Sequence, residues 1–342
     1  MKITKKQPKF VKNRNFLTKI RLKNGISRCA LLSIFILFLV PAYPLRGQAA
    51  SGDVFLFSYF MGNGEDGLHW ARSDDGLNWT AAHNGRSVLK PVVGEDKLMR
   101  DPCVLRGPDG VFRMVWTTAW YGHTIGYASS TDLLHWSEEK AIPVMAREPQ
   151  AENCWAPEVI YDPAQRHYLI FWATSIPGRF PGTDETGHPG SDHRQLNHRI
   201  YSTTTRDFVS FTPTRLHYDG GFDVIDATMA RNGGEWLLFV KNETERPAPE
   251  KNIVLVRCRT PDGPFSAPSQ PITGAYWAEG PTSIQIDGWW YVYFDKYRDK
   301  RFGVVRSRDL EHWEDLSNRL HMPEGIRHGT VIRVPRALAD GL

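Results

Sequence analysis

The hydrophobic residues of this chain are grouped in short runs rather than spaced at helical intervals. Beyond residue 50, runs rich in Val, Ile, Phe, Tyr and Trp alternate with Gly, Pro, Asn and Asp. This alternation is typical of strands separated by turns. The clearest runs are VFLFSYF (54–60), VFRMVWTT (111–118), HYLIFWAT (167–174), EWLLFVKN (235–242) and WWYVYFDKY (289–297). The pattern therefore predicts an all-β fold.

A repeated motif marks the turns. Five segments end in an Asp that is followed, after a short gap, by an aromatic residue: ARSDDGLNW (71–79), ASSTDLLHW (128–136), STTTRDFVSF (202–211), VRCRTPDGPF (256–265) and VVRSRDLEHW (304–313). An Asp in this place accepts backbone N–H bonds in a tight turn, and the ring packs into the neighbouring sheet. We interpret these residues as structural and call the segments the tail motifs.

A second series of motifs alternates with the first and would open each unit. These head motifs are MRDPCV (99–104), CWAPEV (154–159), VIDATM (224–229), AEGPTS (278–283) and IRHGTV (326–331). The first tail motif has no head before it, and the last head has no tail after it, so joining the two ends completes a fifth unit. The repeat predicts a five-bladed β-propeller over 51–342, a single domain with one blade shared between the N- and C-terminal segments.

The second unit is longer than the others. Its surplus lies in 175–198, a segment rich in Gly, Pro, His and Asp. An insertion confined to one blade predicts a loop at the rim that shapes a binding pocket.

The net charge of the whole chain is positive only because of its first 50 residues, and the remainder is acidic. The chain has 42 Lys and Arg against 38 Asp and Glu, a formal charge of +4, but eleven of the basic residues and none of the acids lie in 1–50. The remainder then has 31 basic and 38 acidic residues, a charge of −7. A nucleic-acid partner is disfavoured, because phosphate binding needs clustered Lys and Arg.

Residues 1–50 have the order of a secretory signal: a basic stretch, the apolar run 30–40, then prolines and small residues. Eleven apolar residues are too few to cross a bilayer, which takes about 20. We expect cleavage near Ala49 or Ala50 and a secreted or periplasmic protein with no stable membrane insertion afterwards. An uncleaved signal anchor is the alternative.

Three cysteines remain beyond the signal: Cys103, Cys154 and Cys258. An odd count leaves at least one thiol free, and we interpret all three as small buried side chains.

The head motifs carry the candidate chemistry. The first strand of each propeller blade lies nearest the axis, so the heads should bring together Asp101, Glu158, Asp226, Glu279 and His328. Carboxylates at matching positions on converging strands raise each other's pKa and predict a shared site. Paired carboxylates amid aromatic residues are typical of glycoside hydrolysis. Trp120 and Trp155, beside the heads, are candidates for contact with a sugar ring.

The ordered set RDP, WAP, DAT, EGP and RHGT resembles glycoside hydrolase family 43, the five-bladed propeller arabinofuranosidases and xylosidases, over roughly 54–334. By this resemblance Asp101 matches the general base, Glu279 the general acid, and Asp226 the third carboxylate, which orients the acid and raises its pKa. The resemblance also implies inversion of the anomeric configuration. Asp101 lies further into the chain than the family's base usually does, which suggests a less common subgroup.

The resemblance implies that His328 is an axial histidine, which in some members lies near a bound calcium ion. We therefore expect that no cofactor is required. The metal candidate is a calcium ion at the propeller axis, near His328. Substrate-binding candidates are Trp120, Trp155, Glu158, Arg199 and His328. Arg199 and Lys241 have an equally good structural interpretation, in which each is a strand residue paired with a nearby acid.

These features favour a monomeric, exo-acting, inverting glycosidase on oligosaccharides or polysaccharides. The favoured activity releases a terminal pentofuranose, as an α-L-arabinofuranosidase does, with a β-D-xylosidase or a galactofuranosidase as alternatives on the same scaffold. A sialidase would need an arginine cluster and a Tyr nucleophile where the heads supply carboxylates. The non-enzymatic alternative is a carbohydrate-binding propeller, which we would expect to lack one of the three acids.

Overall fold

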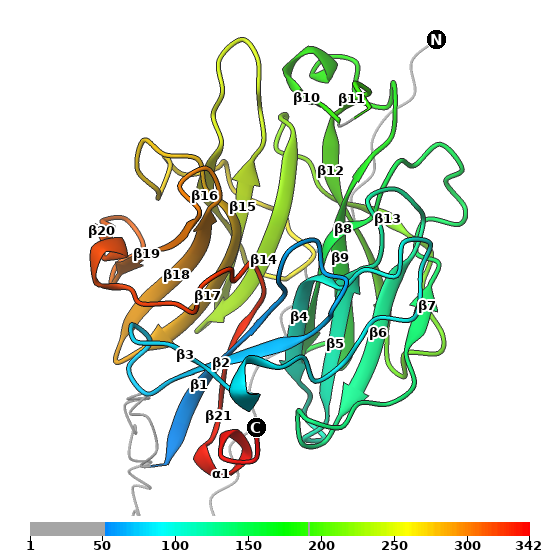
Figure 1. The fold of residues 1–342 in the computed structure, drawn as a ribbon. Coiled ribbons are helices and arrows are strands. Elements are labelled where there is room, and N and C mark those ends of the chain that lie inside the picture. Colours follow the sequence, from blue (N-terminus) through cyan, green and yellow to red (C-terminus); the bar gives the residue numbers. More distant parts are fainter. Residues whose placement is uncertain (1–51, 191) are drawn as a thin grey trace, which may run out of the picture. The chain divides into compact units, whose positions relative to one another are not determined.

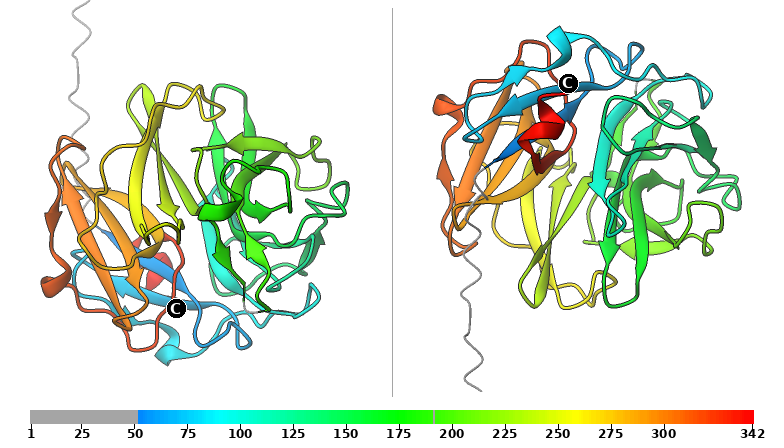
Figure 2. Two further views of the ribbon diagram at one scale, coloured as in Figure 1. Left: turned by 90° about the horizontal axis from the view of Figure 1, so that it is seen from above. Right: turned by 90° about the horizontal axis from the view of Figure 1, so that it is seen from below.

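Apart from one two-stranded hairpin, the strands in the described part of the chain form five antiparallel sheets arranged around one axis (Figures 1 and 2). The computed structural model describes residues 52–190 and 192–342. The predicted signal sequence, 1–50, and its cleavage site at Ala49 or Ala50 lie outside the described residues. The all-β, five-bladed propeller predicted from the repeats is confirmed.

Each blade is described by its strands, from the axis outward. Blade 1 comprises β4 (Arg100–Arg106), β5 (Phe112–Thr117), β6 (Ile125–Ser130) and β7 (Lys140–Ile142). Blade 2 comprises β8 (Trp155–Asp162), β9 (His167–Ser175), β12 (His198–Thr205) and β13 (Arg215–Tyr218). Blade 3 comprises β14 (Val224–Asn232), β15 (Glu235–Asn242) and β16 (Asn252–Cys258). Blade 4 comprises β17 (Glu279–Ile286), β18 (Trp289–Lys296), β19 (Arg301–Ser307) and β20 (Glu314–Asp315).

Blade 5 is shared between the two ends of the chain, as predicted. It comprises β21 (Val331–Pro335), β1 (Asp53–Tyr59), β2 (His69–Ser73) and β3 (Thr80–Ala81). The C-terminal strand β21 pairs with β1 in antiparallel register, with Val54 opposite Val334. This pairing closes the ring and covers the inner edge of β1, which would otherwise be open to another chain.

The tail motifs form the predicted turns. Asp132 accepts the backbone N–H groups of Leu134 and His135, at 3.0 and 2.7 Å. The same pattern recurs at Asp75, Asp207 and Asp309.

The fifth tail motif departs from the pattern. Two residues after Asp262 stands Pro264, which has no N–H group to donate, and the Asp262 carboxylate instead forms an ion pair with Arg215. The fourth strand of blade 3 is reduced to one bridge between Cys258 and Phe265. Blade 3 therefore has three strands, whereas the other four blades have four.

The core lies between adjacent blades and is rich in aromatic side chains. Trp70, Trp116 and Trp172 are fully buried. Cys103, Cys154 and Cys258 are buried and free, which confirms their interpretation as small core residues.

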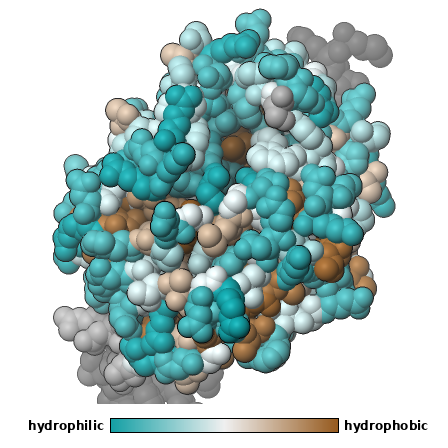
Figure 3. All heavy atoms as spheres, in the orientation of Figure 1, coloured by the Kyte–Doolittle hydropathy of each residue, from teal (hydrophilic) through white to brown (hydrophobic). Residues whose placement is uncertain are grey.

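The insertion predicted in blade 2 forms a separate hairpin between β9 and β12. Its strands are β10 (His188–Pro189) and β11 (Gln195–Leu196), and they project at the upper end of blade 2 in Figure 1. The remaining elements are short helices: η1 (His83–Gly85), η2 (Asp184–Thr186), η3 (Ser317–Arg319) and α1 (Arg336–Ala339). None of the helices in the described ranges has the length and apolarity to cross a membrane. The face drawn in Figure 3 is largely hydrophilic, with hydrophobic residues in small scattered groups.

Candidate active site

The inner strands of blades 1 to 4 share an irregularity at their head motifs. In each, the pairing register shifts beside a residue with positive φ: 52° at Asp101, 45° at Ala156, 49° at Asp226 and 59° at Gly280. In three heads this residue precedes a proline, which has no N–H to give to the ladder. Such a bulge leaves residues unpaired and re-aims side chains, and a positive φ in a residue other than Gly costs roughly 1–3 kcal/mol.

The bulges place consecutive side chains on one surface. Arg100 and Asp101 both line the same pocket, as do Ile225 and Asp226. An unbroken strand would turn alternate side chains to opposite faces. The strained backbone is therefore what brings the acids of different blades into one pocket.

The acids do not occupy equivalent positions, so the expectation of matching strand positions is wrong. Asp101 and Asp226 are the bulged residues of their strands, whereas Glu279 stands one residue before its bulge. Glu158 lies two residues after the bulged Ala156 and therefore deeper along its strand.

The pocket has a volume of about 360 Å³, within the range of small-molecule sites. It is lined by most of the residues singled out in the sequence: Asp101, Asp226, Glu279, His328, Trp120 and Trp155. The structure thus brings side chains from all five blades together.

Two of the predicted binding residues lie elsewhere. Glu158 is not in the lining of this pocket but shares a smaller cavity with Asp101, Asp226 and His328. Burial raises the pKa of its carboxyl group to about 8, and Thr228 Oγ1 donates to it at 2.9 Å. Arg199 is buried away from the pocket, with Nε 2.5 Å from Asp219 Oδ1 and its guanidinium 4.3 Å from the centre of the Phe180 ring. Arg199 therefore packs the blade 2 insertion onto its blade, and the interpretation as a strand residue paired with an acid holds for it.

His328 lies between Asp101 and Glu279. Its Nδ1 is 2.9 Å from Asp101 Oδ1, and its Nε2 is 3.0 Å from Glu279 Oε1. Burial disfavours a charged imidazole, but the two carboxylates outweigh burial and raise the pKa of His328 to about 10. Although burial opposes it, the charged His328 in turn holds the pKa of Asp101 below its usual range.

The pKa values of the other two acids, Glu279 and Asp226, are shifted in opposite directions. Burial would raise the pKa of Glu279, but Lys241 and His328 hold it well below its usual range. Lys241 Nζ lies 2.9 Å from Glu279 Oε2, and Arg327 Nη2 lies 3.2 Å from Oε1. Burial raises the pKa of Asp226 to about 6, against the lowering effects of His328 and Lys241. The neighbouring cations thus favour the ionised form of Glu279, whereas burial favours the protonated form of Asp226, the reverse of the order that the resemblance implied.

One group of side chains around His328 could hold a metal ion. Glu279, Asp295 and His328 lie close enough together to share one. Both His328 nitrogens face carboxylates, and the calcium ion near His328 stays a prediction. Arg327 Nε also lies 2.7 Å from Asp295 Oδ2 and already supplies a positive charge.

Several pocket residues were not singled out in the sequence. Arg100 stacks over Trp120, with its guanidinium carbon 4.3 Å from the ring centre, and its Nη1 donates to Asn63 Oδ1 at 3.1 Å. Trp120 is 43% exposed and forms an open wall. Arg100 and Arg327 directly precede Asp101 and His328 in the head motifs, so their place in the sequence could have identified them as pocket residues.

Comparisons with known proteins agree with the geometry of the pocket. A family model described as a probable glycosyl hydrolase domain, related to glycoside hydrolase family 43, matches residues 52–340. An α-L-arabinofuranosidase of Bifidobacterium longum subsp. longum is 30% identical over 183 residues, which cover 46% of this chain and 16% of that protein. The chain therefore matches about a sixth of the length of this relative.

The solved structures that this chain resembles are more distant in sequence. An α-L-arabinofuranosidase from Lactobacillus brevis is 16% identical, with a TM-score of 0.48, covering 64% of this chain and 72% of that chain. An exo-β-1,3-galactanase from Phanerochaete chrysosporium is 11% identical, with a TM-score of 0.48, covering 71% of this chain and 53% of that chain.

Proposed function

Because the chain belongs to the family of probable glycosyl hydrolase domains related to family 43 and is a glycosidase, we propose that it releases a terminal pentofuranose by inverting hydrolysis. The observation that carries this proposal is one pocket in which carboxylates from three blades meet, Asp101, Asp226 and Glu279 among them, with His328 between Asp101 and Glu279. The arabinofuranosidase relative favours α-L-arabinofuranose as the sugar. A β-D-xyloside or a galactofuranoside is the alternative substrate for the same pocket.

Asp101 is the proposed general base. Its ionised carboxylate is held by Thr117, whose Oγ1 donates to Oδ2 at 2.8 Å, and by His328 on the other oxygen. A water molecule attacking the anomeric carbon would lose its proton to this carboxylate.

Glu279 is the proposed general acid, which protonates the leaving oxygen. Asp101 and Glu279 face opposite nitrogens of one imidazole ring, so the ring keeps the two carboxylates apart. Inverting enzymes need such a separation, since about 6.5–9.5 Å between the two carboxyl groups leaves room for a water molecule.

We further propose that His328 supplies the proton that Glu279 lacks in the free site. One turnover moves a proton from Glu279 to the leaving group and another from water to Asp101. Nε2 of His328 can give its proton to Glu279, while Nδ1 keeps the proton that faces Asp101. After the turnover Asp101 releases the proton from water to the solvent, and Nε2 takes up another proton from the solvent. The site then returns to its starting state.

A second assignment exchanges Glu279 and Asp226. The pKa of Asp226, raised to about 6 by burial, favours this carboxyl over Glu279 as the one that takes up a proton first when the pH falls. Its Oδ2 accepts the backbone N–H of Gly280 at 2.9 Å, which orients it beside Glu279.

The proposed activity is tested with aryl α-L-arabinofuranosides, β-D-xylosides and β-D-galactofuranosides. We expect the wild-type protein to hydrolyse the first, with NMR showing the inverted anomer as the first product. Asp101→Ala should lose activity by orders of magnitude, while Asp287→Asn, at an exposed turn of blade 4, should not. Retention of configuration, or full activity in Asp101→Ala, would contradict the mechanism.

The site of action is a further proposal. The order of basic, apolar and small residues in 1–50 supports export to the periplasm or the medium. N-terminal sequencing of the mature protein would test cleavage near Ala49 or Ala50.

A further inference from the structure

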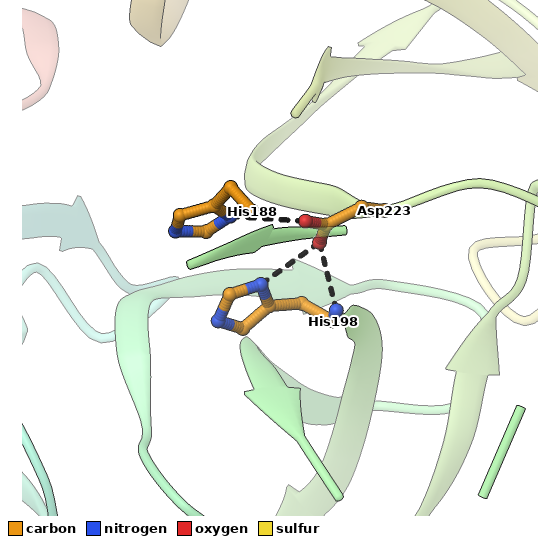
Figure 4. A group of neighbouring side chains, drawn as sticks. All are labelled: His188, His198 and Asp223. Atoms are coloured by element: carbon orange, nitrogen blue, oxygen red, sulfur yellow. Dashed lines mark hydrogen bonds and ion pairs between the residues drawn. The ribbon is translucent and has the colours of Figure 1, made fainter. Parts of the chain in front are cut away.

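The insertion in blade 2 places one histidine in the wall of the active-site pocket. His188, on β10, lines the pocket, and its side chain is 17% exposed. Its Nδ1 lies 3.1 Å from Asp223 Oδ2 and 3.6 Å from Glu243 Oε1 (Figure 4). Neither the head motifs nor the tail motifs include this residue.

Asp223 is a buried anchor shared by His188 and a second histidine, His198. Its Oδ1 accepts the backbone N–H of His198 at 2.7 Å and faces the Nδ1 of the same residue at 2.8 Å (Figure 4). Its pKa lies well below the usual range because the histidines outweigh burial. An ionised carboxylate only accepts hydrogen bonds, so each histidine Nδ1 beside it carries a proton.

The tautomer of His198 follows independently from Asn153. Asn153 Oδ1 accepts the backbone N–H of Ser175 at 2.9 Å, so its Nδ2 is the group that faces His198 Nε2 at 3.0 Å. Nδ2 donates, so Nε2 of His198 accepts and Nδ1 holds the hydrogen. His188, His198 and Asp223 therefore form a hydrogen-bonded chain, and His198 Nδ1 has no lone pair for a metal ion.

The His188 ring is fixed in orientation, and one of its nitrogens is left for a ligand. The ring stacks on His198 with centres 5.5 Å apart, next to Trp155 at 6.5 Å. Within the described ranges, Nε2 of His188 has no hydrogen-bond partner, and it is not among the fully buried polar atoms that lack one. A ring held through Nδ1 in a pocket wall presents Nε2 as a polar contact.

The hairpin that carries His188 is tied to the blades on both sides. The backbone N–H of Glu245, in the loop between β15 and β16 of blade 3, donates to Thr186 O at 2.9 Å. On the other side Arg194 pairs with Glu152 and stacks over the Tyr121 ring at 4.1 Å. These contacts on both sides hold the insertion, and with it His188, in place beside the pocket.

We propose that His188 Nε2 hydrogen-bonds one hydroxyl group of the sugar in the pocket. Through this bond the protein selects for sugars that carry this hydroxyl group. The inference rests on the proposed function, because it assumes that this pocket holds the sugar. A site that hydrogen-bonds a hydroxyl discriminates against analogues without it, since the buried partner is then left unpaired.

The test compares intact and singly deoxygenated aryl glycosides in the wild-type protein and in His188→Phe. This variant keeps an aromatic ring but removes both nitrogens. We expect kcat/KM on the intact glycoside to fall about 10- to 100-fold, and one monodeoxy glycoside to be poor for the wild type yet no worse for the variant. His188→Gln, which keeps a polar group, should lose less.

A matched control is His135→Phe, since His135 Nδ1 also pairs with an Asp, at 2.9 Å, but on an exposed turn. It should leave kcat/KM and the deoxy profile unchanged. If His188→Phe folds with wild-type thermal stability and still discriminates between the same two glycosides, the inference is wrong while the proposed function stands. If the wild-type protein hydrolyses no intact glycoside, the proposed function fails and the inference falls with it.

Discussion

Lys241 Nζ lies 2.9 Å from Glu279 Oε2, although the lysine side chain is only 1% exposed. Lys241 is on β15 of blade 3, and Glu279 begins β17 of blade 4. The ammonium also faces Glu243 and the Tyr297 ring, whose centre is 4.8 Å away. Because it is sealed from water, its charge acts on Glu279 with little screening. Lys241 therefore does not line the pocket, but it controls the charge of the proposed acid.

Replacing Lys241 by Met should move the pH dependence of catalysis. Lys241 stabilises the Glu279 carboxylate, so its removal raises the pKa of Glu279. A general acid works while it is protonated, so the alkaline limb of the kcat/KM profile should move to higher pH, by about one unit or more.

Lys296→Met is the matched control for this variant. Lys296 is also a buried lysine paired with an acid, 3.4 Å from Asp299, but it has no contact with Glu279. Its profile should match the wild type. An unmoved alkaline limb in Lys241→Met would contradict the assignment of Glu279 as the acid.

Leaving groups of different basicity should distinguish the two candidate acids. A dinitrophenolate departs without a proton, whereas an alkoxide needs one. If Glu279 is the acid, Glu279→Ala should lose about 10²–10⁴-fold in kcat on alkyl glycosides or oligosaccharides but retain most activity on dinitrophenyl glycosides. Asp226→Ala should lose activity on both kinds of substrate. The opposite pattern would transfer the acid role to Asp226.

The charge on His328 should also appear in the stability of the protein. Its pKa in the folded state, about 10, lies above its ordinary value of 6.5, so the stabilisation is complete below about pH 6.5 and is lost as the pH rises toward 10. The difference in Tm between the wild type and His328→Gln should therefore be largest in acid and shrink above neutral pH. A difference that grows with pH would contradict a charged His328.

The blades could be predicted from the sequence because the tail and head motifs each mark a fixed place in a repeating unit. The tail turn needs only an Asp and two free N–H groups, and the exception at Asp262 follows from Pro264 alone. The convergence of Asp101, Asp226 and Glu279 was predictable for the same reason. Their unequal positions were not, because they follow from the bulges, for which the proline after the bulged residue is only a partial signal.

The rest of the site depends on packing between segments far apart in the chain. His188 enters the pocket because its hairpin folds back onto neighbouring blades, and no motif marks it. The head series placed Glu158 with the other acids. It does share the smaller cavity with Asp101 and Asp226, but its strand position keeps it out of the larger pocket. The reversed pKa order of Glu279 and Asp226 comes from Lys241, which belongs to a strand pattern typical of the core.

The tail turns make a final prediction about stability. Asp132 accepts two backbone N–H bonds, and these, above all that of His135, hold its pKa well below the usual range. Asp132→Ala should lower the free energy of unfolding by about 1 kcal/mol. Asp262→Ala, in the turn that lacks these bonds, should change it by less, since an exposed ion pair contributes about 0–1 kcal/mol. Because the folded pKa is lowered, the contribution of Asp132 should be present above about pH 4 and disappear in stronger acid. Urea unfolding of both variants at neutral pH and at low pH measures this, and equal losses for the two would contradict the assigned role of the turn.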